Sequence, residues 1–109
     1  MEQAIAIEAF SALAQKSRMA IFRLLVRTGP DGLQVGEISS RLGIVASTLS
    51  GHLAVLRRAG LLKAVRHQRQ IYYSADLRVV NELVGFLLAD CCDGRQENCS
   101  EIISLLEAG

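Results

Sequence analysis

The spacing of apolar residues changes at Gly60, and this change constrains the fold more than any other feature of the chain. Before Gly60, apolar residues recur every three or four positions, which predicts α-helices. After it the spacing shortens to two in residues 62–66 and 70–74, which predicts two strands joined through 66–69. Helical spacing returns after Asp76, a residue that favours a helix N-terminus. The sequence therefore predicts a mainly α-helical fold with one small β-hairpin.

Four helices are expected before Gly60, over residues 4–15, over 18–26 after Ser17, over about 35–42, and over about 46–59. Gly29-Pro30-Asp31-Gly32 is a strong turn signal between the second and third, and Gly43 is expected to close the third. The inward-facing side chains should be Ile5, Ala9, Ala12, Leu13, Ile21, Leu24, Leu25, Val35, Ile38, Leu42, Leu49, Leu53 and Leu56. A long last helix should follow Asp76, with Asp93-Gly94 breaking it and a short helix over 100–108.

Two short helices, a tight turn and a basic hairpin are typical of a winged helix-turn-helix, so double-stranded DNA is the predicted partner. A recognition helix needs small polar or donor side chains opposite its apolar stripe, so that it can enter the major groove. The helix at 46–59 offers such a face, made of Ser47, Thr48, Ser50, Gly51 and His52. The arginines at its end and at the hairpin tip suit phosphates: Arg57, Arg58, Arg66 and Arg69.

The distribution of charge agrees with this interpretation. The net charge of the 109 residues is only +1, but residues 33–75 carry +5 and residues 76–109 carry −5. A basic middle segment favours an anionic partner, although chance clustering on a solvated surface would give the same pattern. The chain is too short for two domains, so we expect one domain over 1–109. With no membrane-length apolar run and no signal peptide, we expect a cytoplasmic protein with reduced thiols.

Four stretches resemble the arsenical-resistance repressor (ArsR/SmtB) family over roughly residues 10–90. They are Leu-Ala-Gln-Lys-Ser-Arg at 13–18, Ser-Thr-Leu-Ser-Gly-His-Leu at 47–53, Leu-Arg-Arg-Ala-Gly-Leu-Leu at 56–62 and Ile-Tyr-Tyr at 71–73. The most specific part is Ser-x-His-Leu followed by Leu-x-x-Ala-Gly-Leu. The resemblance implies a dimeric winged-helix repressor that occupies an operator and leaves it when an effector binds.

Three positions depart from the family pattern. Val45 stands where a capping Ser is usual, Gly51 lies inside the recognition helix, and Gln68 replaces a Gly in the hairpin turn. Loss of the cap and the internal Gly each cost a helix about 1 kcal/mol. They affect the expected base contacts rather than the expected fold.

The last helix carries more apolar residues than one globular face requires: Leu77, Val80, Leu83, Val84, Leu87 and Leu88. With the first helix it could form a second buried surface, which pairing of two copies would satisfy. We therefore expect a homodimer through the first and last long helices. Burial of the last helix in its own monomer is the alternative.

All three cysteines of the chain, Cys91, Cys92 and Cys99, lie within nine residues. Three thiolates with no histidine nearby suit a soft, thiophilic ion, and trivalent arsenic needs three sulfurs because its lone pair fills the remaining position. Zinc usually takes a fourth ligand. We therefore predict that segment 91–109 holds the effector site, with arsenic(III) as the preferred effector and antimony(III) as the second candidate.

The expected function is an arsenite- and antimonite-responsive transcriptional repressor that is not an enzyme. A redox or persulfide switch on the same scaffold is one alternative, and sensing of Cd, Pb or Cu(I) is another. A small thiol enzyme or arsenical carrier is a third, although the chain has no Cys-x-x-Cys pair, no histidine beside the thiols and no Gly-rich phosphate loop. The resemblance adds that the site has moved to the C-terminal end, because the family's Cys-Val-Cys position is Gln34-Val35-Gly36 here.

Overall fold

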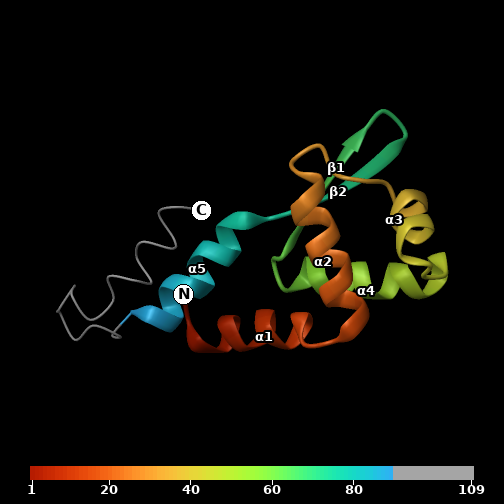
Figure 1. Ribbon diagram of the computed structural model, residues 1–109. Helices are drawn as coiled ribbons and strands as arrows, with labels where there is room; N and C mark the ends of the chain where they lie inside the picture. The colour runs from red at the N-terminus through yellow and green to blue at the C-terminus, as the bar shows by residue number, and fades with distance from the viewer. Residues whose placement is uncertain (90–109) are drawn as a thin grey trace.

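The computed structural model describes residues 1–89, which form five helices and one hairpin (Figure 1). The elements are α1 (Gln3–Leu13), α2 (Lys16–Thr28), α3 (Val35–Leu42), α4 (Ala46–Arg58), β1 (Leu62–His67), β2 (Gln70–Ala75) and α5 (Leu77–Leu88). This order confirms the mainly α-helical fold with a small β-hairpin, and it is that of a winged helix-turn-helix. We call the β1–β2 hairpin the wing.

One apolar core joins the helices to the base of the wing. Its largest fully buried side chains come from α2, α3, α4 and the residue that precedes β1: Ile21, Leu25, Ile38, Leu49, Leu53, Leu56 and Leu61. The stripes predicted for α2 and α4 are therefore confirmed. Leu13, Val35 and Leu42 are half-buried and pack against the same core.

The prediction for α1 was wrong at one position. Ile5 is 50% exposed, whereas Ala6, Ala9 and Ala12 are buried. Methyl side chains let the α1 backbone approach α2 and α4 closely, which a face carrying the larger Ile5 does not allow. The apolar residues of α1 thus outnumber those that its own chain buries.

Local hydrogen bonds explain where helices begin and end. Asp76 caps α5 as predicted, since its Oδ1 accepts from the Arg78 N–H at 3.1 Å. Gly43 closes α3 in the left-handed conformation (φ 66°) that costs glycine little. Helix α2 begins earlier than predicted, because the Gln15 side chain accepts from the Arg18 N–H at 2.8 Å.

The wing is an antiparallel ladder in which Leu62 pairs with Ala75 and His67 with Gln70. A bridge fastens it to the segment before α3, since Leu33 and Tyr73 exchange hydrogen bonds of 2.9 and 2.8 Å between backbone atoms. Gly32 allows this approach, because a Cβ there would collide with the Tyr73 carbonyl and its φ is 73°. The segment after the turn thus holds the wing against the helix-turn-helix.

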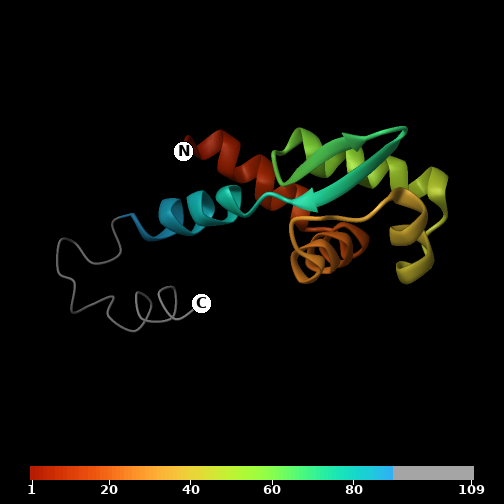
Figure 2. The same cartoon turned by 90° about the horizontal axis from the view of Figure 1, so that it is seen from above.

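Helix α5 packs differently from the others. Leu83 is its only buried residue, whereas Leu77 and Leu87 are 53% and 61% exposed. In both Figure 1 and Figure 2 it runs away from the body of the molecule, beside the N-terminal half of α1. The apolar excess predicted for this helix is thus confirmed within residues 1–89.

Several expectations lie outside the described residues: the break at Asp93-Gly94, the short helix over 100–108 and the thiol segment 91–109. The single-domain prediction for 1–109 also extends beyond them. Among residues 1–89, no helix has the length and apolar character that crossing a membrane requires.

Candidate nucleic-acid interface

Helix α4 has one apolar side and one polar side. Leu49, Leu53 and Leu56 are buried, which anchors the helix to the core. The polar side chains near its N-terminus, Ser47, Thr48 and Ser50, are exposed, as is Gly51, while His52 is half-buried. The polar face predicted for a recognition helix is therefore present, and among residues 1–89 it is left largely exposed.

The N-terminus of α4 lacks a side-chain cap, because a valine stands where a capping serine is usual. Val45 occupies the N-cap position, makes no side-chain cap and is 70% exposed. The Ser50 hydroxyl donates to the Ala46 carbonyl at 3.1 Å, so it is already satisfied within the helix. Ser47 and Thr48 make no side-chain hydrogen bond within residues 1–89 and are the better candidates to donate to a base.

The predicted phosphate ligands occupy two separate places. Arg57 and Arg58 are exposed in the last turn of α4, about 15 Å along the axis from Thr48. Arg66, at the end of β1, and Arg69, in the turn, are exposed at the wing tip. The Arg66 Nε donates to the Gln68 carbonyl at 3.1 Å.

The wing tip and the start of α4 lie toward the same end of the molecule. Figures 1 and 2 both place the hairpin tip, α3 and the first turns of α4 at one end, with α5 at the other. The turn itself is tight, with Gln68 at φ 60°, the conformation that favours the Gly usual at this position. The geometry thus places a polar helix face and a basic hairpin where one DNA duplex can contact both.

A polar network that the sequence did not reveal links the wing to α3. The Gln34 amide Nε2 donates to Gln70 Oε1 and to the Tyr72 hydroxyl, both at 3.0 Å. The Tyr72 hydroxyl in turn lies 3.2 Å from Gln70 Oε1. Together with the bridge between Leu33 and Tyr73, these bonds hold the wing relative to the helix-turn-helix. No local pattern signals them, because Gln34 and Gln70 are 36 residues apart.

One ion pair occurs within residues 1–89, and it lies away from the interface. The Arg78 Nη2 is 3.1 Å from Asp76 Oδ2 at the start of α5. The hydrogen bonds from Arg78 hold the pKa of Asp76 below its ordinary value of 3.8, against the opposing effect of burial. This carboxylate stabilises the α5 N-terminus and is not part of the DNA-facing surface.

The predicted metal ligands Cys91, Cys92 and Cys99 lie outside the described residues. Within residues 1–89 no three side chains of His, Cys, Asp or Glu come together as a metal site would require. His52 and His67 lie on different elements, α4 and β1.

An amphipathic recognition helix beside a basic hairpin defines a DNA-binding winged helix-turn-helix protein. The family model described as "Helix-turn-helix domain" matches residues 13–65. The chain is 35% identical to the HTH-type transcriptional regulator YbzH of Bacillus subtilis, over 74% of this chain and 93% of YbzH. It is 33% identical to the transcriptional activator HlyU of Vibrio cholerae, over 84% of this chain and 82% of HlyU.

Comparison with solved structures also finds transcriptional regulators with this fold. HlyU superposes with a TM-score of 0.63 at 35% identity, covering 80% of this chain and 97% of HlyU, and a reduced form of HlyU also matches. The homodimeric DNA-binding domain of Mb0332 from Mycobacterium bovis, a possible ArsR-family regulator, has a TM-score of 0.64. At 23% identity, over 83% of this chain and 82% of that domain, it shares the fold alone. This chain belongs to the family of helix-turn-helix transcriptional regulators, with a winged helix-turn-helix fold of the ArsR type.

Proposed function

We propose that the protein is a transcriptional repressor that binds operator DNA as a homodimer and is released by arsenic(III) or antimony(III) at Cys91, Cys92 and Cys99. The observation that carries the DNA-binding part is the exposed polar face of α4 beside the basic wing, backed by three buried leucines. Ser47 and Thr48 contact base edges, while the arginines of α4 and the wing contact phosphates.

Exposed apolar side chains on α1 and α5 support the homodimer. Ile5, Ile7 and Phe10 on α1 are 50%, 58% and 37% exposed, and Leu87 near the end of α5 is 61% exposed. The N-terminal part of α1 and helix α5 lie at the end of the molecule opposite the wing tip (Figures 1 and 2). A second copy packed on this surface would bury it, leaving both recognition helices outward for the half-sites of a palindrome. The Mb0332 domain with the same fold is homodimeric.

The chemistry of the three cysteines supports the effector. Soft thiolates prefer soft ions, and three of them match the coordination number of a trivalent metalloid. Cys91 follows the last residue of α5, Leu88, by only three positions, so capture of an ion there would pull directly on the dimer helix. A coupling of about 1–3 kcal/mol, or about 5–150-fold in DNA affinity, is typical of such switches.

The experiment is fluorescence anisotropy of a labelled operator fragment with fully reduced protein. We expect arsenite and antimonite to raise the Kd, and cadmium, zinc, lead and copper(I) to leave it unchanged. Single Cys→Ser variants at 91, 92 and 99 should bind the operator normally and lose the response, whereas the matched control Ser100→Ala should keep it. Release by a different soft metal would refute arsenic as effector, and failure to bind DNA would refute the whole proposal.

A redox or persulfide switch is the second candidate, and the match to a reduced form of HlyU is the observation that favours it. A disulfide between adjacent residues is strained, so Cys99 would pair with Cys91 or Cys92. Peroxide or persulfide would then release the operator and dithiothreitol would restore binding. Arsenite would then fail to release the operator from the reduced parent protein. The two candidates are therefore separated by which additive, arsenite or peroxide, releases the operator from the parent protein, and the Cys→Ser variants should lose whichever response the parent shows.

A further inference from the structure

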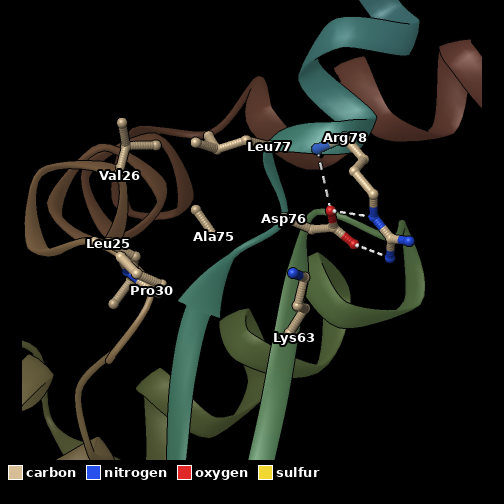
Figure 3. Close-up of a pocket in the computed structure, with 9 residues that line it drawn as sticks. Leu25, Val26, Pro30, Lys63, Ala75, Asp76, Leu77 and Arg78 are labelled. Atoms are coloured by element: carbon tan, nitrogen blue, oxygen red, sulfur yellow. Dashed lines mark hydrogen bonds and ion pairs between the residues drawn. The ribbon is translucent and has the colours of Figure 1, made fainter.

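A cavity of about 270 Å³ lies where α2, the wing and α5 meet (Figure 3). Its walls are the last turn of α2 with the turn after it, the base of the wing and the first residues of α5. The side chains that define its chemistry are Leu25, Val26, Lys63, Asp76, Leu77 and Arg78. Nothing in the DNA-binding role requires a hollow at this position.

One side of the cavity is apolar. Leu25 is fully buried, and Pro30 and Ala75 lie close to it. Val26 and Leu77, which come from different helices, are 41% and 53% exposed and lie near each other across the opening (Figure 3). Covering such side chains with an apolar group is favourable, because it removes apolar surface from water.

The other side is charged and has an excess of positive charge. Asp76 already accepts from the Arg78 N–H, Nε and Nη2 at 3.1, 3.2 and 3.1 Å. Lys63 points toward the same carboxylate in Figure 3 but makes no ion pair within residues 1–89. Two cations therefore surround one anion whose acceptor sites Arg78 largely occupies, and the Lys63 ammonium keeps donors for another anion.

We propose that this cavity binds a small monocarboxylate with an apolar body, of which benzoate is the simplest probe. The apolar body would cover Val26 and Leu77, and the carboxylate would accept from Lys63. An apolar cavity of about 150 Å³ already holds a benzene ring, so the size is sufficient. Inorganic phosphate lacks the apolar body, and a dianion would be repelled by Asp76.

The proposed site goes beyond the operator and thiol sites, because it shares no residue with either. Its walls belong to three parts of the fold: helix α2, the base of the wing and helix α5, which precedes the cysteines in the sequence. A ligand bound here would contact all three parts at once. The site can be tested without DNA and without metalloid.

The test is a titration of reduced, ¹⁵N-labelled full-length protein with benzoate, followed by amide chemical shifts. We expect saturable shifts centred on Lys63, Ala75 and Leu77. Benzyl alcohol, which has the same ring but no charge, should bind about tenfold more weakly, since a hydrogen bond to a charged group is lost.

The chain offers a matched control, because Lys16 and Lys63 are its only lysines. Lys63→Gln should weaken benzoate binding about tenfold, whereas Lys16→Gln, at the opposite end of α2, should leave it unchanged. Leu77→Asp changes an exposed side chain and should abolish binding by placing a carboxylate at the opening. If Ala75→Leu also folds, it should fill the cavity and abolish binding.

Three results would overturn the proposal. Benzoate and benzyl alcohol could bind equally well, or Lys63→Gln could behave like Lys16→Gln, and in both cases charge recognition would be absent. Shifts at these amides that follow protein concentration instead of benzoate would show that a second copy covers the cavity. Each of these leaves the operator and thiol proposals untouched.

Discussion

Helices α4 and α5 are nearly equal in length, 13 and 12 residues, but they differ in how many of their apolar side chains are buried. In α4 the three leucines that face the core are all buried. In α5 only Leu83 is buried, although the helix carries seven other large apolar residues: Leu77, Val79, Val80, Val84, Phe86, Leu87 and Leu88. Helix α4 thus buries its leucines within its own chain, whereas α1 and α5 leave large apolar side chains exposed.

The difference in burial between α4 and α5 agrees with two different roles, base recognition for α4 and association for α5. A recognition helix must be held rigidly, because its side chains have to meet bases with fixed geometry. In the proposed homodimer the exposed apolar face of α5 would be buried against a second copy, so its stability would depend on association. Four predictions test this contrast, from the largest expected effect to the smallest.

Leu56→Ala should lower the free energy of unfolding by about 2–5 kcal/mol, because it leaves a cavity in the core beneath α4. The matched change on α5, Leu87→Ala, removes the same atoms from an exposed site. It should cost less than about 0.5 kcal/mol in the monomer. Urea unfolding at several protein concentrations measures both effects. The Leu87→Ala loss should grow as concentration rises, and a large loss independent of concentration would contradict the contrast.

Arg66→Gln combined with Arg69→Gln should weaken operator binding about tenfold at moderate salt, since two phosphate contacts disappear. The plot of log Kd against log salt should become less steep by about 2. A control that removes two exposed charges of α2, Lys16→Gln with Arg23→Gln, should change the slope less. Equal effects from both pairs would mean that the wing contributes only net charge.

Gly51→Ala should stabilise the fold by up to about 1 kcal/mol, because alanine favours a helix and its Cβ would meet no atom within 4 Å. Gly32→Ala should do the opposite, because its Cβ would collide with the Tyr73 carbonyl. Thermal unfolding measures both. If DNA approaches α4 closely, Gly51→Ala will also weaken operator binding despite the more stable fold.

Asp76→Asn should have the smallest effect, and it should depend on pH. The folded-state pKa of Asp76 lies below 3.8, so its charged form stabilises the fold at neutral pH. That contribution is present above the unfolded value and is lost as the pH falls through the folded one. The variant, in which Asn can still cap α5, should be less stable than the parent at pH 7 and equal to it well below pH 3.8. A stability difference between variant and parent that stays the same from pH 7 to well below pH 3.8 would contradict this role of the Asp76 charge.

Much of the fold follows from local patterns. The buried residues of α2 and α4, the cap at Asp76 and the change to a hairpin after Gly60 were all predictable, because helical and strand periodicities depend on neighbours within a few residues. The polar face of α4 follows from the same periodicity. The effector assignment to Cys91, Cys92 and Cys99 stays a prediction.

Other features depend on contacts between distant residues. The choice of Ala6, Ala9 and Ala12 over Ile5 was decided by how closely α1 packs against α2 and α4. The hydrogen bonds from Gln34 to Gln70 and Tyr72 join residues more than 30 positions apart, so no local sequence pattern predicts them.

The sequence by itself determined which segments are helices and strands and which residue types each segment presents, since those properties arise from local backbone and side-chain preferences. Only the tertiary structure decided which apolar faces are buried. The tertiary structure buried the leucines of α4 within the chain and left Ile5, Ile7 and Leu87 exposed. The physical reason is that burial depends on which surfaces meet, and hydrophobic attraction alone does not choose among them.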